Sequence, residues 1–210
     1  MSKYAKLSAW LVGAWFVVSI TASALHLYQT GPDQPPLPLG LAALTPLLVF
    51  LVWFARSRPF REFTLSLSPR LLTLVQSWRI GGFAFVVLAA YRMLPNLFAL
   101  PAGWGDIAIG FTAVWAALKL ATPDNRRRFI VWQVLGIADL VNAVLLGTLT
   151  GVISPHGIPT SLMTVLPLSV IPTFFVPLYT MIHVICIAQA LRWPAQQTRY
   201  SEARISSATA

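Results

Sequence analysis

Three ionisable residues lie inside long apolar stretches of the sequence, where charged side chains are rare. They are Arg79, Asp139 and His183, and each belongs to a different stretch. A buried arginine needs a partner such as a carboxylate, and histidine, with an ordinary pKa of ~6.5, exchanges protons near neutral pH. This combination indicates either a polar binding site for a small solute or an acid and a base that act on a substrate.

The composition determines what kind of elements must position these residues. Of the 210 residues, 57% are hydrophobic and 10% are charged, and the mean hydropathy is +0.71. A water-soluble domain carries about 25% charged residues. The surface of this protein must therefore face lipid, and the sequence predicts an integral membrane protein with the lipid bilayer as its partner.

Helices that cross a bilayer need about 20 mostly apolar residues. Six segments meet or approach this length: Leu7–Leu27, Leu37–Ala55, Leu71–Tyr91, Asp106–Ala121, Phe129–Thr150 and Leu168–Leu191. We therefore predict an all-α bundle of six transmembrane helices in a domain over residues 1–193. The polar residues 194–210 are predicted to form a flexible cytoplasmic tail.

The basic residues predict the orientation of the bundle. Thirteen of the 15 Lys and Arg residues fall at one end of the six segments, while Arg92 lies at the other end and Arg79 within a segment. Cytoplasmic loops attract Lys and Arg, so both termini are predicted to be cytoplasmic. This distribution, together with anionic lipid at the inner face, accounts for the net charge of +9 without a nucleic-acid partner. Cleavage of residues 1–24 as a signal peptide, after Ala22-Ser23-Ala24, stays open as an alternative.

Helix geometry places the three ionisable residues in one layer. Counted from the predicted cytoplasmic ends, Arg79 and His183 lie ~12 Å deep and Asp139 ~15 Å deep. Gln76 and Asn142 lie three residues from Arg79 and Asp139, and therefore on the same helix faces. We predict a core polar site of these five residues, with an ion pair between Arg79 and Asp139.

A second group of polar residues is predicted at the outer face: Asp106, Arg92, His26 and His156. The stretch PAGWGD, residues 101–106, is typical of a tight turn with Asp106 as the N-cap of the following helix. Nothing in the spacing defines a metal site, so no metal is predicted, and no cofactor is indicated. The single Cys186 excludes an intramolecular disulfide.

Prolines at 155, 159, 167, 172 and 177 precede or enter the last apolar segment. Each proline removes a backbone donor and tends to kink or end a helix. We therefore predict that residues 154–177 are irregular, or dip into the membrane, before the sixth helix continues.

Four motifs carry a resemblance to a known group. They are Gln76-x-x-Arg79, Gly103-x-Gly105-Asp106, Trp132-x-x-x-Gly136 and Pro172-x-x-x-Val176-Pro177 ahead of His183. In these motifs the chain resembles uncharacterised bacterial multi-spanning membrane proteins of about this length. The resemblance implies a location in the bacterial plasma (inner) membrane and implies no activity.

Three functions are compatible with the sequence. The first is transport or permeation of a small, anionic or proton-coupled solute through the core polar site. The second is a membrane-embedded enzyme that acts on a lipid, quinone or isoprenoid, with Asp139 and His183 as acid and base. The third is a structural subunit that joins copies of itself or a larger complex. A cavity open to water favours the first, a lateral opening to lipid the second, and the absence of a cavity the third.

Overall fold

The computed structural model describes residues 3–30, 36–153 and 157–193, with the side chains of 151 and 152 excepted. Within this part of the chain, six helices are long and apolar enough to cross a membrane. They are Lys3–Ala24, Leu37–Arg56, Pro69–Ala90, Asn96–Leu120, Pro123–Thr150 and Ile171–Leu191. The predicted all-α bundle with six membrane-length helices is therefore confirmed. The predicted tail over residues 194–210 lies outside the described residues.

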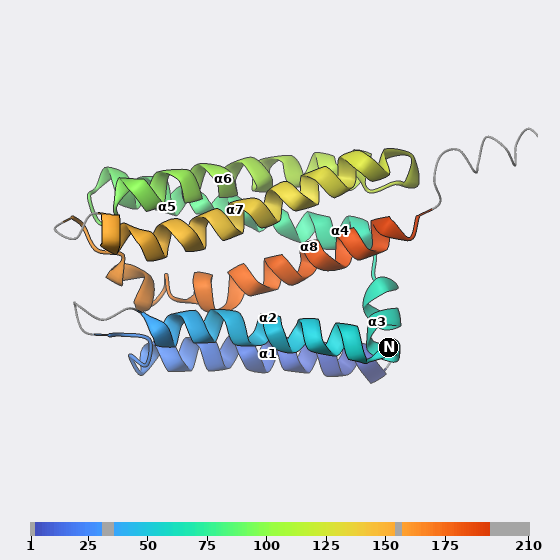
Figure 1. The fold of residues 1–210 in the computed structure, drawn as a ribbon, viewed down its shortest axis with the longest axis horizontal. Coiled ribbons are helices and arrows are strands. Elements are labelled where there is room, and N and C mark those ends of the chain that lie inside the picture. Colours follow the sequence, from blue (N-terminus) through green and yellow to red (C-terminus); the bar gives the residue numbers. More distant parts are fainter. Residues whose placement is uncertain (1–2, 31–35, 154–156, 194–210) are drawn as a thin grey trace, which may run out of the picture.

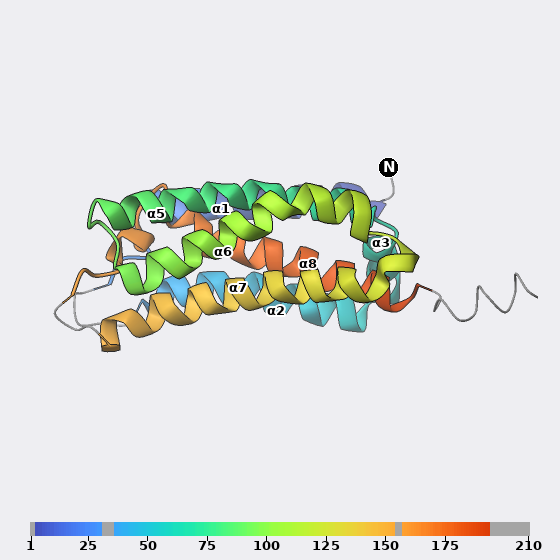
Figure 2. The ribbon, with the colours of Figure 1, turned by 90° about the horizontal axis from the view of Figure 1, so that it is seen from above.

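Helix α8 (Val176–Leu191) occupies the middle of the bundle, where it contacts α2 (Leu37–Arg56) and α7 (Arg126–Ile153). Helix α7 also contacts α6 (Asn96–Trp115), and these two form the upper layer in Figure 1. Helix α1 (Lys3–Ala24) and α2 form the lower layer, and the turned view of Figure 2 shows them on opposite sides of α8. The beginning of α1 and the end of α8 lie at the same end of the bundle, as six crossings require.

A short helix, α3 (Arg58–Leu65), lies across the end of the bundle where α1 begins. Ser57 caps its first turn by accepting a hydrogen bond from the Phe60 backbone amide. The Phe60 ring stacks on Trp53 of α2, with 3.9 Å between the ring centroids. From α8, Gln189 Nε2 donates to carbonyls at the end of α3 and just after it, the shortest of these bonds being 2.7 Å to Leu67. These contacts hold α3 against the bundle.

The third crossing is one continuous apolar run, but it is not one regular helix. It consists of α4 (Pro69–Val75), a 3-10 segment η1 (Gln76–Gly82) and α5 (Phe83–Ala90). Segment η1 packs backbone to backbone against α6, because a Cβ on Gly110 would lie 2.4 Å from the Ile80 nitrogen. The segment that carries Arg79 is therefore held at close range to α6.

The fourth crossing begins ten residues earlier than the sequence predicts. Helix α6 starts at Asn96, directly after the extended Pro95, and continues through the π-helical segment η2 (Ala116–Leu120). Pro101 lies within this helix, so the predicted tight turn over residues 101–106 is wrong. Inside an α-helix Pro101 cannot donate to the carbonyl four residues earlier and its ring crowds that carbonyl, but membrane helices tolerate such prolines.

The prediction of an irregular proline-rich segment is confirmed for the residues described within it; residues 154–156 lie outside them. A 3-10 turn, η4 (Ser161–Thr164), is followed by the π-helical segment η5 (Ile171–Phe175), and regular helix resumes with α8. Segment η5 receives a hydrogen bond from α1, where Trp15 Nε1 donates to the Thr173 carbonyl at 3.1 Å.

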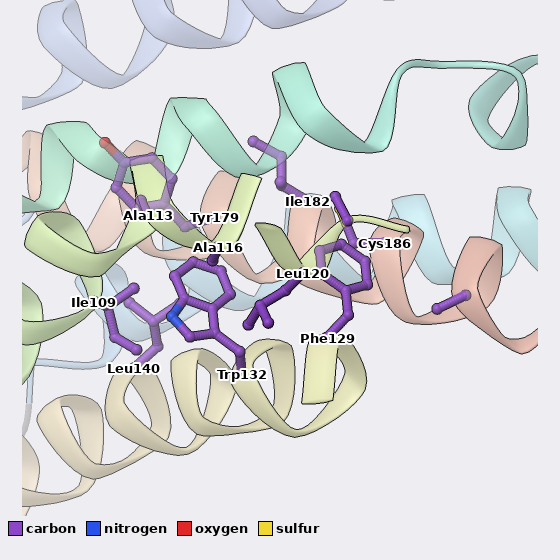
Figure 3. Packing of buried hydrophobic residues seen from close by; sticks show 12 residues of the cluster. Ile109, Ala113, Ala116, Leu120, Phe129, Trp132, Leu140, Tyr179, Ile182 and Cys186 are labelled. Atoms are coloured by element: carbon purple, nitrogen blue, oxygen red, sulfur yellow. The ribbon is translucent and has the colours of Figure 1, made fainter. Parts of the chain in front are cut away.

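The largest apolar core lies where α6, α7 and α8 meet, and Figure 3 shows its side chains converging from these helices. Phe129 and Trp132 of α7 pack there against α6 and α8. Large apolar side chains on the outer faces, such as Trp10 and Phe111, are mostly exposed. In a bilayer these side chains face lipid, which is the surface that the composition requires.

Candidate functional site

The buried Arg79 is the centre of a polar cluster between η1, α6, α7 and α8. Its Nε donates to Asp106 Oδ1 of α6 at 2.7 Å, and its Nη2 donates to Asp139 Oδ2 of α7. The guanidinium side chain is fully buried, whereas the carboxyl side chains of Asp106 and Asp139 are 15% and 13% exposed. The predicted pairing of Arg79 with Asp139 is present, and Asp106 is a second partner that the sequence analysis placed elsewhere.

The remaining contacts of Arg79 determine which group donates and which accepts in a longer chain of hydrogen bonds. Nη1 donates to the Gly136 carbonyl and to His183 Nε2, both at 3.3 Å. Arginine has only donors, so His183 Nε2 must accept, and its Nδ1 then carries the hydrogen that it donates to Gln133 Oε1 at 2.5 Å. Gln133 Nε2 in turn donates to the Thr73 hydroxyl at 3.2 Å.

These donor and acceptor roles argue against the predicted role of His183 as a group that exchanges protons. Both ring nitrogens are engaged, and a second ring proton would point Nε2–H at the guanidinium, where two donors would face each other. In this arrangement His183 is neutral and positions Arg79 and Gln133. The carboxylates, rather than the histidine, are the groups at this site that remain able to accept a proton.

Three glycines provide the space that the cluster occupies. A Cβ on Gly105 would lie 1.6 Å from Asp139 Oδ1, and a Cβ on Gly136 would lie 2.3 Å from the His183 ring. Gly82 has the same role, because a Cβ on Gly82 would lie 2.3 Å from the Cβ of Asp106. Gly105 was predicted to lie in a turn, but it is one of three glycines that let the helices approach closely enough for the charged groups to meet.

The other two residues of the predicted core site have different outcomes. Gln76 is fully buried and donates from Nε2 to the Tyr179 carbonyl at 3.3 Å, so it joins η1 to α8 in the same layer. Asn142 is exposed. Its prediction as a core residue is wrong, because six residues of helical rotation place it about 120° away from Gly136, which lies on the buried face.

The predicted outer-face site is not assembled by the described residues. His26 is exposed and hydrogen-bonds to Gln29, Arg92 is exposed, and Asp106 belongs to the core cluster instead. His156 lies outside the described residues. Among the residues that are described, no three His, Cys, Asp or Glu side chains are grouped as a metal site would require.

Sequence reasoning missed Gln133 and Thr73 and misplaced Asp106. Gln133 lies three residues before Gly136, and this spacing was a usable signal for a shared helix face. Asp106 was misplaced because Pro101, Gly103 and Gly105 are turn formers in soluble proteins. Inside a membrane helix the same small residues also mark close packing.

The cluster has an excess of negative charge and borders a cavity. Two carboxylates face one guanidinium, so the ionised cluster carries one uncompensated negative charge with His183 neutral. Arg79 and Asp106 line a cavity of about 240 Å³, which we call the site cavity. Its other lining residues are Trp78, Gly81, Gly82, Phe85, Leu140, Ile171, Phe175, Val176 and Tyr179.

The site cavity opens between helices. The lining residues that the structure describes all belong to the membrane-length helices, and none of them belongs to a loop at either end of the bundle. Trp78 forms part of its wall and is 75% exposed on the outer face of η1. Trp78 and Gly81 are the exposed residues of this lining, so the cavity reaches the surface beside Trp78, on the side of η1 that faces lipid.

A second and larger cavity of about 460 Å³, the outer cavity, lies at the end of the bundle opposite α3. Its lining includes Gln29, Met93 and Leu162. An apolar cluster, which we call the apolar plug, consists of the buried residues Phe85, Ala89, Leu94, Phe98, Ala99, Ala102 and Met163. Phe85 of this plug also lines the site cavity, and Leu162, which lines the outer cavity, packs against the plug.

The family described as "Domain of unknown function (DUF8737)" matches residues 35–191, which include every residue of the cluster. Comparison with curated proteins and comparison with solved structures each gave no match.

Proposed function

We propose that this chain, which belongs to the DUF8737 family, is a proton-coupled carrier of a small solute in the bacterial plasma membrane. The observation that carries the proposal is the pair of carboxylates on one buried guanidinium, Asp106 and Asp139 on Arg79. An uncompensated charge at membrane depth costs at least ~3 kcal/mol on insertion scales. One proton or one cation at the carboxylate pair removes that charge, so the site favours their uptake.

The hydrogen bonds that Arg79 already makes limit the charge that a solute at this site can carry. Four of its five N–H donors already point at protein acceptors, namely Asp106, Asp139, Gly136 and His183. An anionic solute would have to displace a carboxylate and would meet the remaining negative charge. Of the two predicted kinds of solute, anionic or proton-coupled, the site therefore favours a proton-coupled solute that carries no negative charge.

The backbone around the site cavity supports the carrier proposal. The 3-10 segment η1 and the π-helical segment η5 both line the site cavity. Irregular backbone at membrane depth is tolerated where it borders a cavity or is buried in protein, and broken helices recur at transporter sites. Changes in these two segments provide a means of opening and closing access to the carboxylates.

The two cavities and the apolar plug fit a carrier with one occluded side. Phe85 and Met163 belong to the plug, which borders the site cavity through Phe85 and packs against Leu162 of the outer cavity. Movement of η4, which carries Met163, would join the two cavities, and closing the lateral opening at the same time would give alternating access.

Proteoliposomes test this proposal. The purified protein is reconstituted around a pH-sensitive dye, an inside-acid pH gradient is imposed, and a panel of neutral and cationic solutes is added outside. A carrier dissipates the gradient for some members of the panel, and Asp106→Asn abolishes that effect while Asp124→Asn, at the end of the bundle, does not. Gradients that decay equally with wild type, with Asp106→Asn and with empty liposomes for all solutes would contradict a carrier.

One observation favours a second candidate, a membrane-embedded enzyme. The site cavity opens beside Trp78 toward lipid, which is the route that a lipid, quinone or isoprenoid substrate would take. Asp106 and Asp139 would then be the acid and the base. Chemical change of a lipid extract incubated with wild type, and its absence with Asp106→Asn, would favour this candidate over transport.

A further inference from the structure

We infer that the site cavity binds a monovalent organic cation with an apolar body, which reaches the cavity from the bilayer and competes with the proton for the carboxylate pair. The inference deepens the proposed function, on which it rests, by naming the substrate class. It follows from the charge of the cluster, the wall of the cavity and the place where the cavity opens.

The charge of the site selects a cation with a single charge. Asp106 and Asp139 together exceed Arg79 by one negative charge, so one positive charge makes the site neutral and two would leave it positive. Asp106 Oδ1 accepts from Arg79, and its Oδ2 has no hydrogen-bond partner among the described residues. Asp106 also lines the cavity, so its carboxylate is the part of the pair that a ligand can reach.

The aromatic walls and the volume of the site cavity favour a ligand with a small apolar group beside its charge. Four aromatic side chains line the site cavity: Trp78, Phe85, Phe175 and Tyr179. Aromatic faces attract cations by cation–π interaction and also pack against apolar groups. The volume of about 240 Å³ is smaller than the roughly 300–1,000 Å³ of sites for drug-sized ligands. A protonated amine or quaternary ammonium with one small apolar substituent fits this combination.

The opening selects the route. The described lining residues come only from the membrane-length helices, and Trp78 lies at the lipid-facing edge. A ligand that first partitions into the bilayer therefore reaches Asp106 without crossing the apolar plug. Small inorganic cations, which do not partition into lipid, lack this route.

Binding of a labelled probe to the full-length protein in lipid nanodiscs tests the inference. The probe is benzyltrimethylammonium, whose charge does not depend on pH, and the comparisons are its uncharged carbon isostere neopentylbenzene and the ring-less tetramethylammonium. We expect saturable binding of benzyltrimethylammonium and much weaker binding of both comparison compounds. Exchange of one proton for one cation weakens the apparent affinity about tenfold for each unit of falling pH in the range where the carboxylate pair takes up its proton.

Two variants separate the charge of the site from direct contact. Asp106→Asn removes the carboxylate in the cavity wall, and Asp139→Asn leaves that carboxylate in place but makes the cluster neutral. We expect each change to weaken binding at least about tenfold, because it removes one negative charge close to the cation in a site of low dielectric constant, and to abolish the pH dependence. Asp124→Asn, the matched control at the end of the bundle, leaves both unchanged.

The outcomes for the inference and for the proposed function are distinct. Equal binding of the cation and its uncharged isostere, or cation binding that does not change with pH in wild type, overturns the inference even if a variant does not fold. Gradient dissipation by neutral solutes without cation binding overturns the inference and leaves the carrier. Cation binding with no movement across proteoliposomes supports the inference and overturns the carrier.

Discussion

The loss of stability on replacing Arg79 tests whether its guanidinium holds both Asp106 and Asp139 or only one of them. In the Arg79→Leu variant, Asp106 and Asp139 lose their shared cation, and the charge of the ionised cluster changes from −1 to −2. In Asp139→Asn the guanidinium keeps Asp106, and the cluster becomes neutral. We therefore expect a large loss of stability from the first change and a small one from the second.

The magnitude follows from the contacts. Removing one partner of a buried ion pair costs ~3–5 kcal/mol, and Arg79→Leu removes the partner of two carboxylates. Asp139→Asn keeps an oxygen that can accept from Nη2 and exchanges a charged hydrogen bond for a neutral one, a difference of about 1 kcal/mol. With about 2–4 °C per kcal/mol for a chain of this size, Arg79→Leu lowers the melting temperature by about 6–20 °C and Asp139→Asn by about 2–4 °C.

Thermal unfolding of the purified variants in nanodiscs measures this difference, with the yield of monodisperse protein as a second readout. The triple variant Arg79→Leu, Asp106→Asn, Asp139→Asn has no charge at the cluster, and it should regain most of the stability lost in Arg79→Leu. Arg58→Leu is the control: it breaks the exposed ion pair with Glu62 and should change the melting temperature little. A loss from Asp139→Asn as large as that from Arg79→Leu would refute the shared-cation account.

The packing of the glycines, the hydrogen bonds of His183 and the orientation of the bundle can each be tested separately. Gly105→Ala and Gly136→Ala place a Cβ within 1.6 Å and 2.3 Å of cluster atoms and should each destabilise the fold by ~1–3 kcal/mol in thermal unfolding, whereas Gly40→Ala, with nothing within 4 Å, should not. Gln133→Leu leaves His183 Nδ1 without its acceptor and should cost ~1–3 kcal/mol, while Asn142→Leu on the exposed face should stay within ~0.5 kcal/mol; equal losses would contradict the hydrogen-bond chain. Reporter fusions after Arg128 and Leu191 should behave as cytoplasmic and one after His156 as external, and an external signal after Arg128 would contradict the orientation.

The sequence predicted the crossings because hydrophobic length is a strong signal. The span Leu37–Arg56 begins at the predicted residue, and the span Ile171–Leu191 ends at the predicted one. The pairing of Arg79 with Asp139 was also predictable, because depth can be counted along a helix and a buried charge needs a partner. The identity of a polar residue at membrane depth thus carried more information than any motif.

The site residues that were predicted wrongly depend on which face of a helix turns inward and on whether small residues mark a turn or close helix packing. Asp106 was assigned to a helix start because proline and glycine precede it, and only the packing of α6 shows that the glycines permit close contact between helices. Asn142 was assigned to the core from its spacing to Asp139, but the face of α7 that packs inward is set by its neighbours. The 3-10 form of η1 had no sequence signal apart from Gly81 and Gly82.

The central claim is that the carboxylate pair takes up one positive charge, and protonation of the pair tests it most directly. Infrared difference spectra between alkaline and acidic pH, recorded on protein labelled with ¹³C at its aspartate carboxyl groups, report protonated carboxyl groups. We predict a carboxylic acid band that Asp106→Asn and Asp139→Asn each remove, that Asp124→Asn leaves intact, and that benzyltrimethylammonium diminishes. If neither Asp106→Asn nor Asp139→Asn removes any carboxylic acid band while the protein stays folded, both residues remain charged and the account is contradicted.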